Sequence, residues 1–142
     1  MIGYFTADGA DYLINLFTAN EQAIPTYYLA LITGDQPGIA SHGSELDEPP
    51  FAEYARAPLE NLSGNWINQP QLALTNIDAS FPVASQDWGI VRFWALCDQA
   101  QDGRVLMAGD FDSFQVSAGD QVVFVAGTLG ISLDLDDWNT QS

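Results

Sequence analysis

The sequence predicts a mainly β protein: a jelly-roll-like antiparallel β-sandwich with one short helix near its N-terminus. About eight short segments rich in β-branched and aromatic residues recur at spacings of roughly 8–12 residues. Glycine, proline and Asp-Gly turn chemistry separates these segments. Strands and crossover helices do not alternate, which argues against a parallel sheet. Only the first segment carries apolar residues at helical spacing.

The helix is expected over residues 8–19. Asp8 suits the N-cap position, because its carboxylate can accept hydrogen bonds from backbone N–H groups of the first turn. Asn20 would end the helix. Between these two residues, four apolar side chains recur at i, i+3, i+4 and i+7 and form one stripe: Ala10, Leu13, Ile14 and Phe17.

The strongest predicted strand covers residues 88–98, which are rich in tryptophan, isoleucine, valine and phenylalanine. An Asp-Gly pair at 102–103 follows it and predicts a hairpin turn. The other predicted strands are 26–33, an edge strand at 51–59 limited by Pro58, a short strand at Trp66, then 71–76, 79–83, 104–109, 111–116, 121–125 and 129–135. Six of their residues are expected in or at the edge of the core: Leu29, Leu31, Trp88, Leu96, Val123 and Ile131.

The 142 residues are expected to form one β-sandwich domain over residues 1–142. Residues 36–50 are rich in glycine, proline and serine and predict a long surface loop, a kind of segment that often carries function. Residues 134–142 begin with Asp134, Asp136 and Asp137 and predict a solvated acidic tail.

The charge balance is strongly acidic: 19 aspartates and glutamates stand against three arginines, with no lysine, for a net charge of −16. Such a charge repels phosphate backbones and anionic lipid headgroups, so no nucleic-acid partner and no membrane partner is expected. No apolar run approaches the length of a membrane span, and the N-terminus has no secretory-signal pattern. Each arginine is expected to have an acidic partner.

Few residues of the chain could act in catalysis or bind a metal ion, and we expect no catalytic residue, no cofactor and no metal. Cys97 lies in an apolar run, where a lone cysteine behaves as a buried hydrophobe, and the single histidine, His42, lies in the glycine-rich loop. A histidine-lined zinc site is excluded by these counts. Two pairs of carboxylates lie close together in the sequence: Asp110 with Asp112, and Asp134 with Asp136. Neither pair has the Asp/Asn/Gly spacing of an EF-hand calcium loop, so both are interpreted as solvated side chains.

Three residues are candidate interface residues: Tyr28, Tyr54 and Arg56. Tyr27 and Tyr28 are adjacent in a predicted strand, so one faces inward and the other outward. Tyr54 and Arg56 belong to residue types favoured at interfaces and lie in the predicted edge strand, free to make contacts. Because open sheet edges must be covered or used, a homo-oligomer is expected.

The order of these signals resembles a family of small structural proteins of tailed bacteriophages, described as tail fibre, minor tail or decoration proteins. The resemblance covers nearly the whole chain and implies a virion location, a β-sandwich and attachment in oligomers to a larger shell or tail. It provides no catalytic residues. The motifs that carry it are the run from Tyr27 to Gly38, Gly43-Ser44-Glu45-Leu46, Tyr54-Ala55-Arg56, Trp66, Asn76, Phe81-Pro82, Trp88-Gly89-Ile90-Val91, Asp98, Asp102-Gly103, Ala118-Gly119-Asp120 and Ala126-Gly127.

Three functions are therefore open. The leading hypothesis is a non-enzymatic virion protein, assembled in the host cytoplasm, that acts as a capsid decoration or tail-associated protein and binds other virion proteins. The first alternative is a tail fibre or tail-tip protein that recognises a glycan or protein on the host surface. The second alternative is a small hydrolase that uses a pair of carboxylates, and it has the least support because one small domain rarely provides the cleft.

Overall fold

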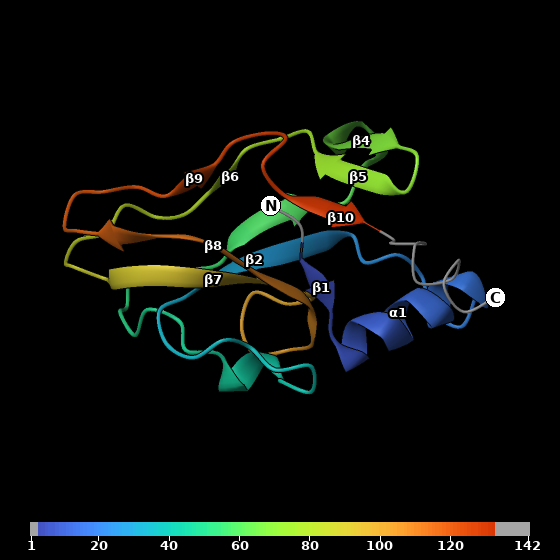
Figure 1. Cartoon of the computed structure of the whole chain (residues 1–142), viewed down its shortest axis with the longest axis horizontal. Helices are drawn as coiled ribbons and strands as arrows, with labels where there is room; N and C mark the ends of the chain where they lie inside the picture. The colour runs from blue at the N-terminus through green and yellow to red at the C-terminus, as the bar shows by residue number, and fades with distance from the viewer. Residues whose placement is uncertain (1–2, 133–142) are drawn as a thin grey trace.

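A five-stranded antiparallel sheet, with strand order β1-β8-β7-β2-β3, forms the centre of the fold (Figure 1). The computed structural model describes residues 3–132. The central sheet contains β1 (Tyr4–Phe5), β2 (Thr26–Ile32), β3 (Ala57–Glu60), β7 (Gly89–Cys97) and β8 (Val105–Val116). The other elements are α1 (Ala7–Phe17), the short helices η1 (Gly43–Glu45) and η2 (Ser63–Asn65), β4 (Trp66–Gln69), β5 (Leu72–Thr75), β6 (Ala79–Ser80), β9 (Val123–Phe124) and β10 (Gly130–Ser132).

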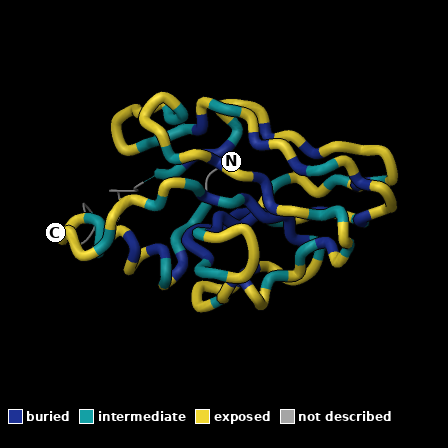
Figure 2. The backbone as a smooth tube through the Cα atoms, turned by 180° about the vertical axis from the view of Figure 1, so that it is seen from behind, coloured by how far each residue is buried: buried dark blue, intermediate teal, exposed yellow. Residues whose placement is uncertain are grey.

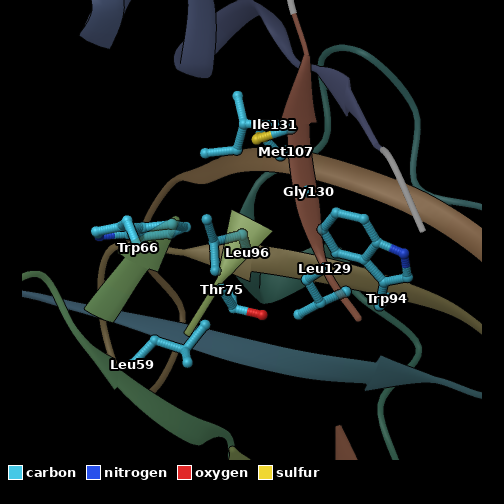
Figure 3. Close-up of a pocket in the computed structure, with 9 residues that line it drawn as sticks. All are labelled: Leu59, Trp66, Thr75, Trp94, Leu96, Met107, Leu129, Gly130 and Ile131. Atoms are coloured by element: carbon cyan, nitrogen blue, oxygen red, sulfur yellow. The ribbon is translucent and has the colours of Figure 1, made fainter. Parts of the chain in front are cut away.

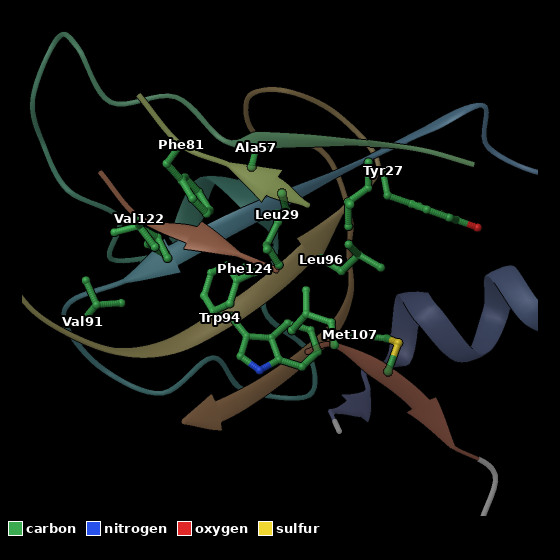
Figure 4. Close-up of a cluster of buried hydrophobic side chains, with 14 of the residues drawn as sticks. Tyr27, Leu29, Ala57, Phe81, Val91, Trp94, Leu96, Met107, Val122 and Phe124 are labelled. Carbon is green, nitrogen blue, oxygen red and sulfur yellow. The ribbon is translucent and has the colours of Figure 1, made fainter. Parts of the chain in front are cut away.

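The main core lies between the central sheet and two smaller sheets, β10-β5-β4 and β6-β9 (Figure 4). Strand β2 alternates, so Leu29 and Leu31 enter this core and are completely buried. From the other layer, Phe81 and Phe124 meet edge to face at 6.0 Å between ring centroids. Burying each such side chain stabilises the fold by roughly 1.5–3 kcal/mol.

The second face of the central sheet is also buried. Ala30 and Ile32 of β2 lie on this face with Cys97 of β7, and all three are fully buried. Leu46, from the long connection between β2 and β3, packs against this cluster. The middle of the central sheet is thus covered on both faces, which explains why β2 and the second half of β7 appear in the sequence as nearly continuous apolar runs. Figure 2 shows the buried centre surrounded by exposed connections.

The single N-terminal helix is confirmed, but its first turn differs from the prediction. The N-cap is Thr6, whose hydroxyl accepts a hydrogen bond from the Gly9 N–H at 3.0 Å and donates one to the Val105 carbonyl. Asp8 lies inside the first turn instead. Gly9 lets the helix approach β8 closely, because a Cβ at this position would lie 1.8 Å from the Leu106 carbonyl oxygen.

The predicted strands are largely confirmed, but several differ in extent. The predicted strands 79–83 and 121–125 are shortened to the two-residue strands β6 and β9. Residues 104–109 and 111–116 form one twelve-residue strand, β8, rather than two. The predicted edge strand 51–59 is shortened to β3, which does lie at the edge of the sheet with Pro58 opposite Tyr28. The Asp-Gly turn is confirmed by the positive φ angles of Asp102 (52°) and Gly103 (72°), a backbone conformation that suits a tight hairpin.

Most of the predicted core is buried, but one assignment is wrong. Val123 is 41% exposed, whereas its neighbours Val122 and Phe124 are buried. Val123 was therefore assigned to the wrong face of the chain at β9, where Val122 and Phe124 face the core. The mainly antiparallel fold with one N-terminal helix is confirmed, whereas jelly-roll-like connectivity and the single-domain boundary of 1–142 stay predictions. The predicted acidic tail, 134–142, lies outside the described residues.

Candidate functional site

Arg56, predicted to contact other proteins, lies inside the molecule and is 6% exposed. All five of its N–H donors are used internally. Nε and one Nη2 proton bind the two oxygens of Glu48, each at 2.9 Å. The other three reach backbone carbonyls of Gly43, Gln99 and Asp102, at 3.2, 2.9 and 2.9 Å. The expectation that Arg56 is free to make contacts is therefore wrong, because the guanidinium joins two loops and has no donor left.

Tyr54, the second predicted contact residue, is half-buried and belongs to the same network. Its hydroxyl donates to Glu48 Oε1 at 2.7 Å and accepts a hydrogen bond from the Leu31 N–H at 3.0 Å. Strand β3 pairs with β2 only as far as Leu29. The Tyr54 hydroxyl thus satisfies a backbone donor on β2 beyond the end of β3. Tyr54 is not free on an edge strand either, because it precedes that strand and covers the edge of its neighbour.

Tyr28 is half-buried at the start of β2, between Pro58 of β3 and Cys97 of β7. Its strand position places it on the second face of the central sheet, opposite the face that Tyr27 and Leu29 occupy. Within residues 3–132, Tyr28 is the one predicted interface residue whose side chain takes no part in an internal hydrogen-bond network. Its contact with another protein stays a prediction.

Arg104, like Arg56, joins separate segments of the chain through ion pairs, and we call these two arginine-centred groups the clamps. Its guanidinium binds Glu21 at 2.7 Å and Asp98 at 2.8 Å, and it lies 5.7 Å from the centroid of the Tyr12 ring. The hydrogen bond from Arg104 is the main reason why the pKa of Glu21 is lowered. The prediction that arginines have acidic partners is confirmed for Arg56 and Arg104. Both clamps fix connections between strands rather than facing a ligand.

The two potential catalytic groups are far from a catalytic environment. Cys97 is completely buried, and burial is the main cause that raises the pKa of its thiol to about 12. His42 is exposed and pairs with Asp8 at 3.5 Å. A nucleophilic cysteine needs an accessible, activated thiolate. The Cys97 thiol is neither accessible nor activated.

The carboxylate pair Asp110 and Asp112 is exposed on β8. Within residues 3–132, no group of three or more His, Cys, Asp or Glu side chains is placed to hold a metal ion. The other pair, Asp134 and Asp136, lies outside the described part of the chain. Over the same described range, no helix is long and apolar enough to cross a membrane.

One narrow cavity of about 20 Å³ lies between the central sheet and the β10-β5-β4 sheet (Figure 3). Trp66 and Trp94 stand on opposite sides of it, with Leu59 and Leu96 between them. Among the described residues, the Trp94 indole N–H is the buried side-chain donor without a hydrogen-bond partner. A space of this size is near the minimum for a single water molecule. It is a packing defect of the core and not a ligand site.

Two apolar surface features of residues 3–132 have neighbouring apolar side chains on one face or around one hollow. The first, the outer face of α1, consists of Ala7, Ala10, Ile14 and Phe17, with Leu13 beside them. Phe17 is 94% exposed and Ile14 61%. An amphipathic helix normally buries its apolar stripe. Here the buried helix residues are Gly9 and Tyr12 instead, so the stripe detected in the sequence faces solvent.

The second feature is the aromatic shelf, defined by the half-buried Phe111 and Phe114 of β8, the buried Phe124 of β9 beneath them, and the exposed Asp112 beside them. Phe111 stacks on Phe114 at 5.3 Å between ring centroids and lies 5.7 Å from Phe124. These residues line an open hollow of about 480 Å³. Helix α1 packs beside the start of β8 at one end of the molecule, and the shelf lies on the half of β8 that runs toward the other end (Figure 1).

The chain matches one protein family, described as podophage GP4 fiber I protein gp80, over residues 6–132. It belongs to this Gp80 family. No curated protein matches the chain. The match begins at Thr6, the N-cap of α1, and ends at Ser132, the last residue of β10. Both apolar surfaces therefore belong to the part of the chain that the Gp80 family shares.

Membership of the Gp80 family confirms the predicted resemblance to small structural proteins of tailed phages. The protein is a phage fibre protein and a part of the virion. The sequence pattern predicted the apolar spacing of α1 and a strand at 111–116, but neither the exposure of the helix stripe nor the aromatic shelf. The orientation of α1 follows from Gly9, which faces β8, and from Tyr12, whose hydroxyl meets that of Tyr27 on β2, and these contacts between distant segments leave no local signal in the sequence.

Proposed function

We propose that this protein is a non-enzymatic structural component of a podophage fibre, assembled in the host cytoplasm, which binds other virion proteins. The observation that carries the proposal is the Gp80 match over residues 6–132, which spans the fold from α1 to β10. Internal roles of Arg56 and Cys97 support it, since the side chains that could serve chemistry instead stabilise the fold. The hydrolase alternative gains no support from the exposed pair Asp110 and Asp112.

The fibre role replaces capsid decoration as the preferred location, because the matching family is described as a fibre protein. Homo-oligomer formation remains part of the proposal. The outer edge of β8 supports it: β1 pairs with this edge at Met107 and Ala108, and Thr6 binds the carbonyls of Val105 and Leu106, so within residues 3–132 only the later part of the strand, from Gly109 on, has no strand paired on that side.

Location and copy number in purified particles test this proposal. Antibody labelling seen by electron microscopy should place the protein on the fibres, and quantitative mass spectrometry should find a small copy number set by the symmetry of the tail. Labelling spread over the whole head, with a copy number comparable to that of the major capsid protein, would instead support a role in capsid decoration. Complete absence of the chain from particles would defeat the proposal.

Host-surface recognition is a second candidate function, and the aromatic shelf favours it. Aromatic faces stack on the apolar faces of sugar rings or bury apolar side chains, and the Asp112 carboxylate can accept hydrogen bonds beside them. The shelf lies on the half of β8 that runs away from α1, so one end could attach to the virion while the other faces the host. Binding of the purified chain to host cells should fall when Phe111 and Phe114 are replaced by serine. The exposed Val83→Ser is the control.

A further inference from the structure

The outer face of α1 has the geometry of a packing surface that nothing within residues 3–132 covers. Ala7, Ala10, Ile14 and Phe17 are spaced three, four and three residues apart, so they form one seam along the helix. The alanines allow a close approach at one end, and Ile14 and Phe17 project at the other. Single exposed apolar residues are common, but a continuous apolar helix face marks an interaction site.

The same face of α1 has one charged side chain, Asp11, which limits the kinds of surface that can pack on it. Asp11 is exposed, three residues before Ile14 and four after Ala7, and therefore lies on the same face. A surface that buries Ile14 and Phe17 also removes water from the Asp11 carboxylate. Desolvating a carboxylate is costly unless a cation or several donors compensate it. The covering surface must therefore place a lysine or arginine near Asp11.

This chain cannot readily supply that cation. Of its three arginines, Arg56 and Arg104 are held in internal ion pairs, which leaves Arg92 on β7 as the exposed one. A second copy would also bring another net charge of −16. The segment 133–142 contributes three aspartates and no cation. Charge complementarity therefore disfavours both a second copy and the C-terminal segment as occupants.

We propose that the outer face of α1 docks onto a different virion protein, whose surface has an apolar socket for Ile14 and Phe17 bordered by lysine or arginine side chains. This inference rests on the proposed function and names the kind of partner. The apolar contact holds the complex, while the basic border provides orientation and a faster encounter with an acidic chain.

Site-specific cross-linking in assembled particles tests the identity of the occupant. The photoreactive analogue p-benzoylphenylalanine replaces Phe17, and particles carrying it are purified and irradiated. We expect a cross-link to one different virion protein, at a site flanked by basic residues when the joined peptides are sequenced. The same analogue at Val83, which is 54% exposed in the connection after β6, is the control and should not give this product.

Substitutions measure the contributions of the apolar and charged groups. Phe17→Ser and Ile14→Asn should each lower the occupancy of the protein in particles by about tenfold, as expected for the loss of a central apolar contact. Their thermal unfolding should be unchanged, because both side chains project into solvent. Asp11→Asn should make attachment less sensitive to salt, whereas Asp110→Asn, the same change on β8, should not.

The outcomes separate this inference from the proposed function. If the wild-type chain is absent from particles, the fibre role itself fails. If the chain is present but position 17 cross-links to a second copy or to residues 133–142, the proposed occupant is wrong. Unchanged occupancy of both Phe17→Ser and Ile14→Asn would also overturn the inference, while leaving the fibre role intact.

Discussion

Arg56 holds Glu48 through two parallel hydrogen bonds, Nε to Oε1 and Nη2 to Oε2, each 2.9 Å long. The arginine side chain is 3% exposed and the glutamate 18%, so the pair is shielded from water. The planar fork of the guanidinium matches a carboxylate in a way that no lysine can. This pair fixes the long connection between β2 and β3 against the β7–β8 turn.

Arg56→Met should destabilise the fold by about 3–5 kcal/mol, because it leaves the Glu48 charge and three loop carbonyls without their partner. Arg56→Lys should recover only part of this loss, since an ammonium cannot reach all five acceptors. The free energy of unfolding, obtained from urea denaturation, measures both effects. Arg92→Met, at the exposed arginine of β7, is the matched control and should change stability by less than about 0.5 kcal/mol.

Adjacent valines near β9 offer a test of the register. Val122 is 9% exposed and Val123 is 41% exposed. Val122→Ala should therefore cost roughly 2 kcal/mol, from the lost burial and the cavity left behind, and Val123→Ala much less. Thermal unfolding of the two variants measures the difference. Equal losses would show that the two side chains are not placed on opposite faces.

Local features of the sequence predicted the central strands well. Strands β2 and β7 are long apolar runs, and the Asp-Gly pair between β7 and β8 has few alternatives to a tight turn. The roles of Tyr54 and Arg56 could not be found in this way. Their partners come from residues 31, 43, 48, 99 and 102, and only the folded chain brings these together.

The spacing of apolar residues likewise could not predict which side of α1 packs against the rest of the protein. The spacing of its apolar residues identifies a helix but does not state which side meets the sheet. Gly9 and Tyr12 make that contact, the first through its lack of a side chain and the second through a hydroxyl 2.9 Å from that of Tyr27. A stripe that appears to be core in a sequence can therefore be an interaction surface in the structure.

Cys97 should be unreactive in the native protein. Its thiol is fully buried, and its pKa, raised to about 12 mainly by burial, leaves almost no thiolate at pH 8. A thiol-specific reagent such as Ellman's reagent should label the chain only after denaturant is added. Rapid labelling of the folded protein at pH 8 would contradict the burial of β7 at this position.

The stabilising contribution of Glu53 to the fold should be lost at acid pH. Its Oε1 accepts hydrogen bonds from the Trp88 indole N–H at 3.1 Å and from the Ser85 N–H at 3.2 Å. The indole bond is the main cause that lowers the pKa of Glu53 from 4.5 to about 2. A carboxyl group with a lowered pKa in the folded state contributes stability above its unfolded pKa and loses that contribution as the pH falls.

The stability difference between wild type and Glu53→Gln should therefore be constant above about pH 5 and shrink between pH 4.5 and 2. Comparing the two proteins is necessary because the other carboxylates also titrate in this range and relieve the repulsion of a net charge of −16. Glu60→Gln, at an exposed glutamate of β3, controls for the general loss of one charge. The Trp88 indole proton gives a direct readout by NMR, and its shift should titrate with a midpoint near 2. A midpoint near 4.5 would mean that the indole does not stabilise the Glu53 carboxylate.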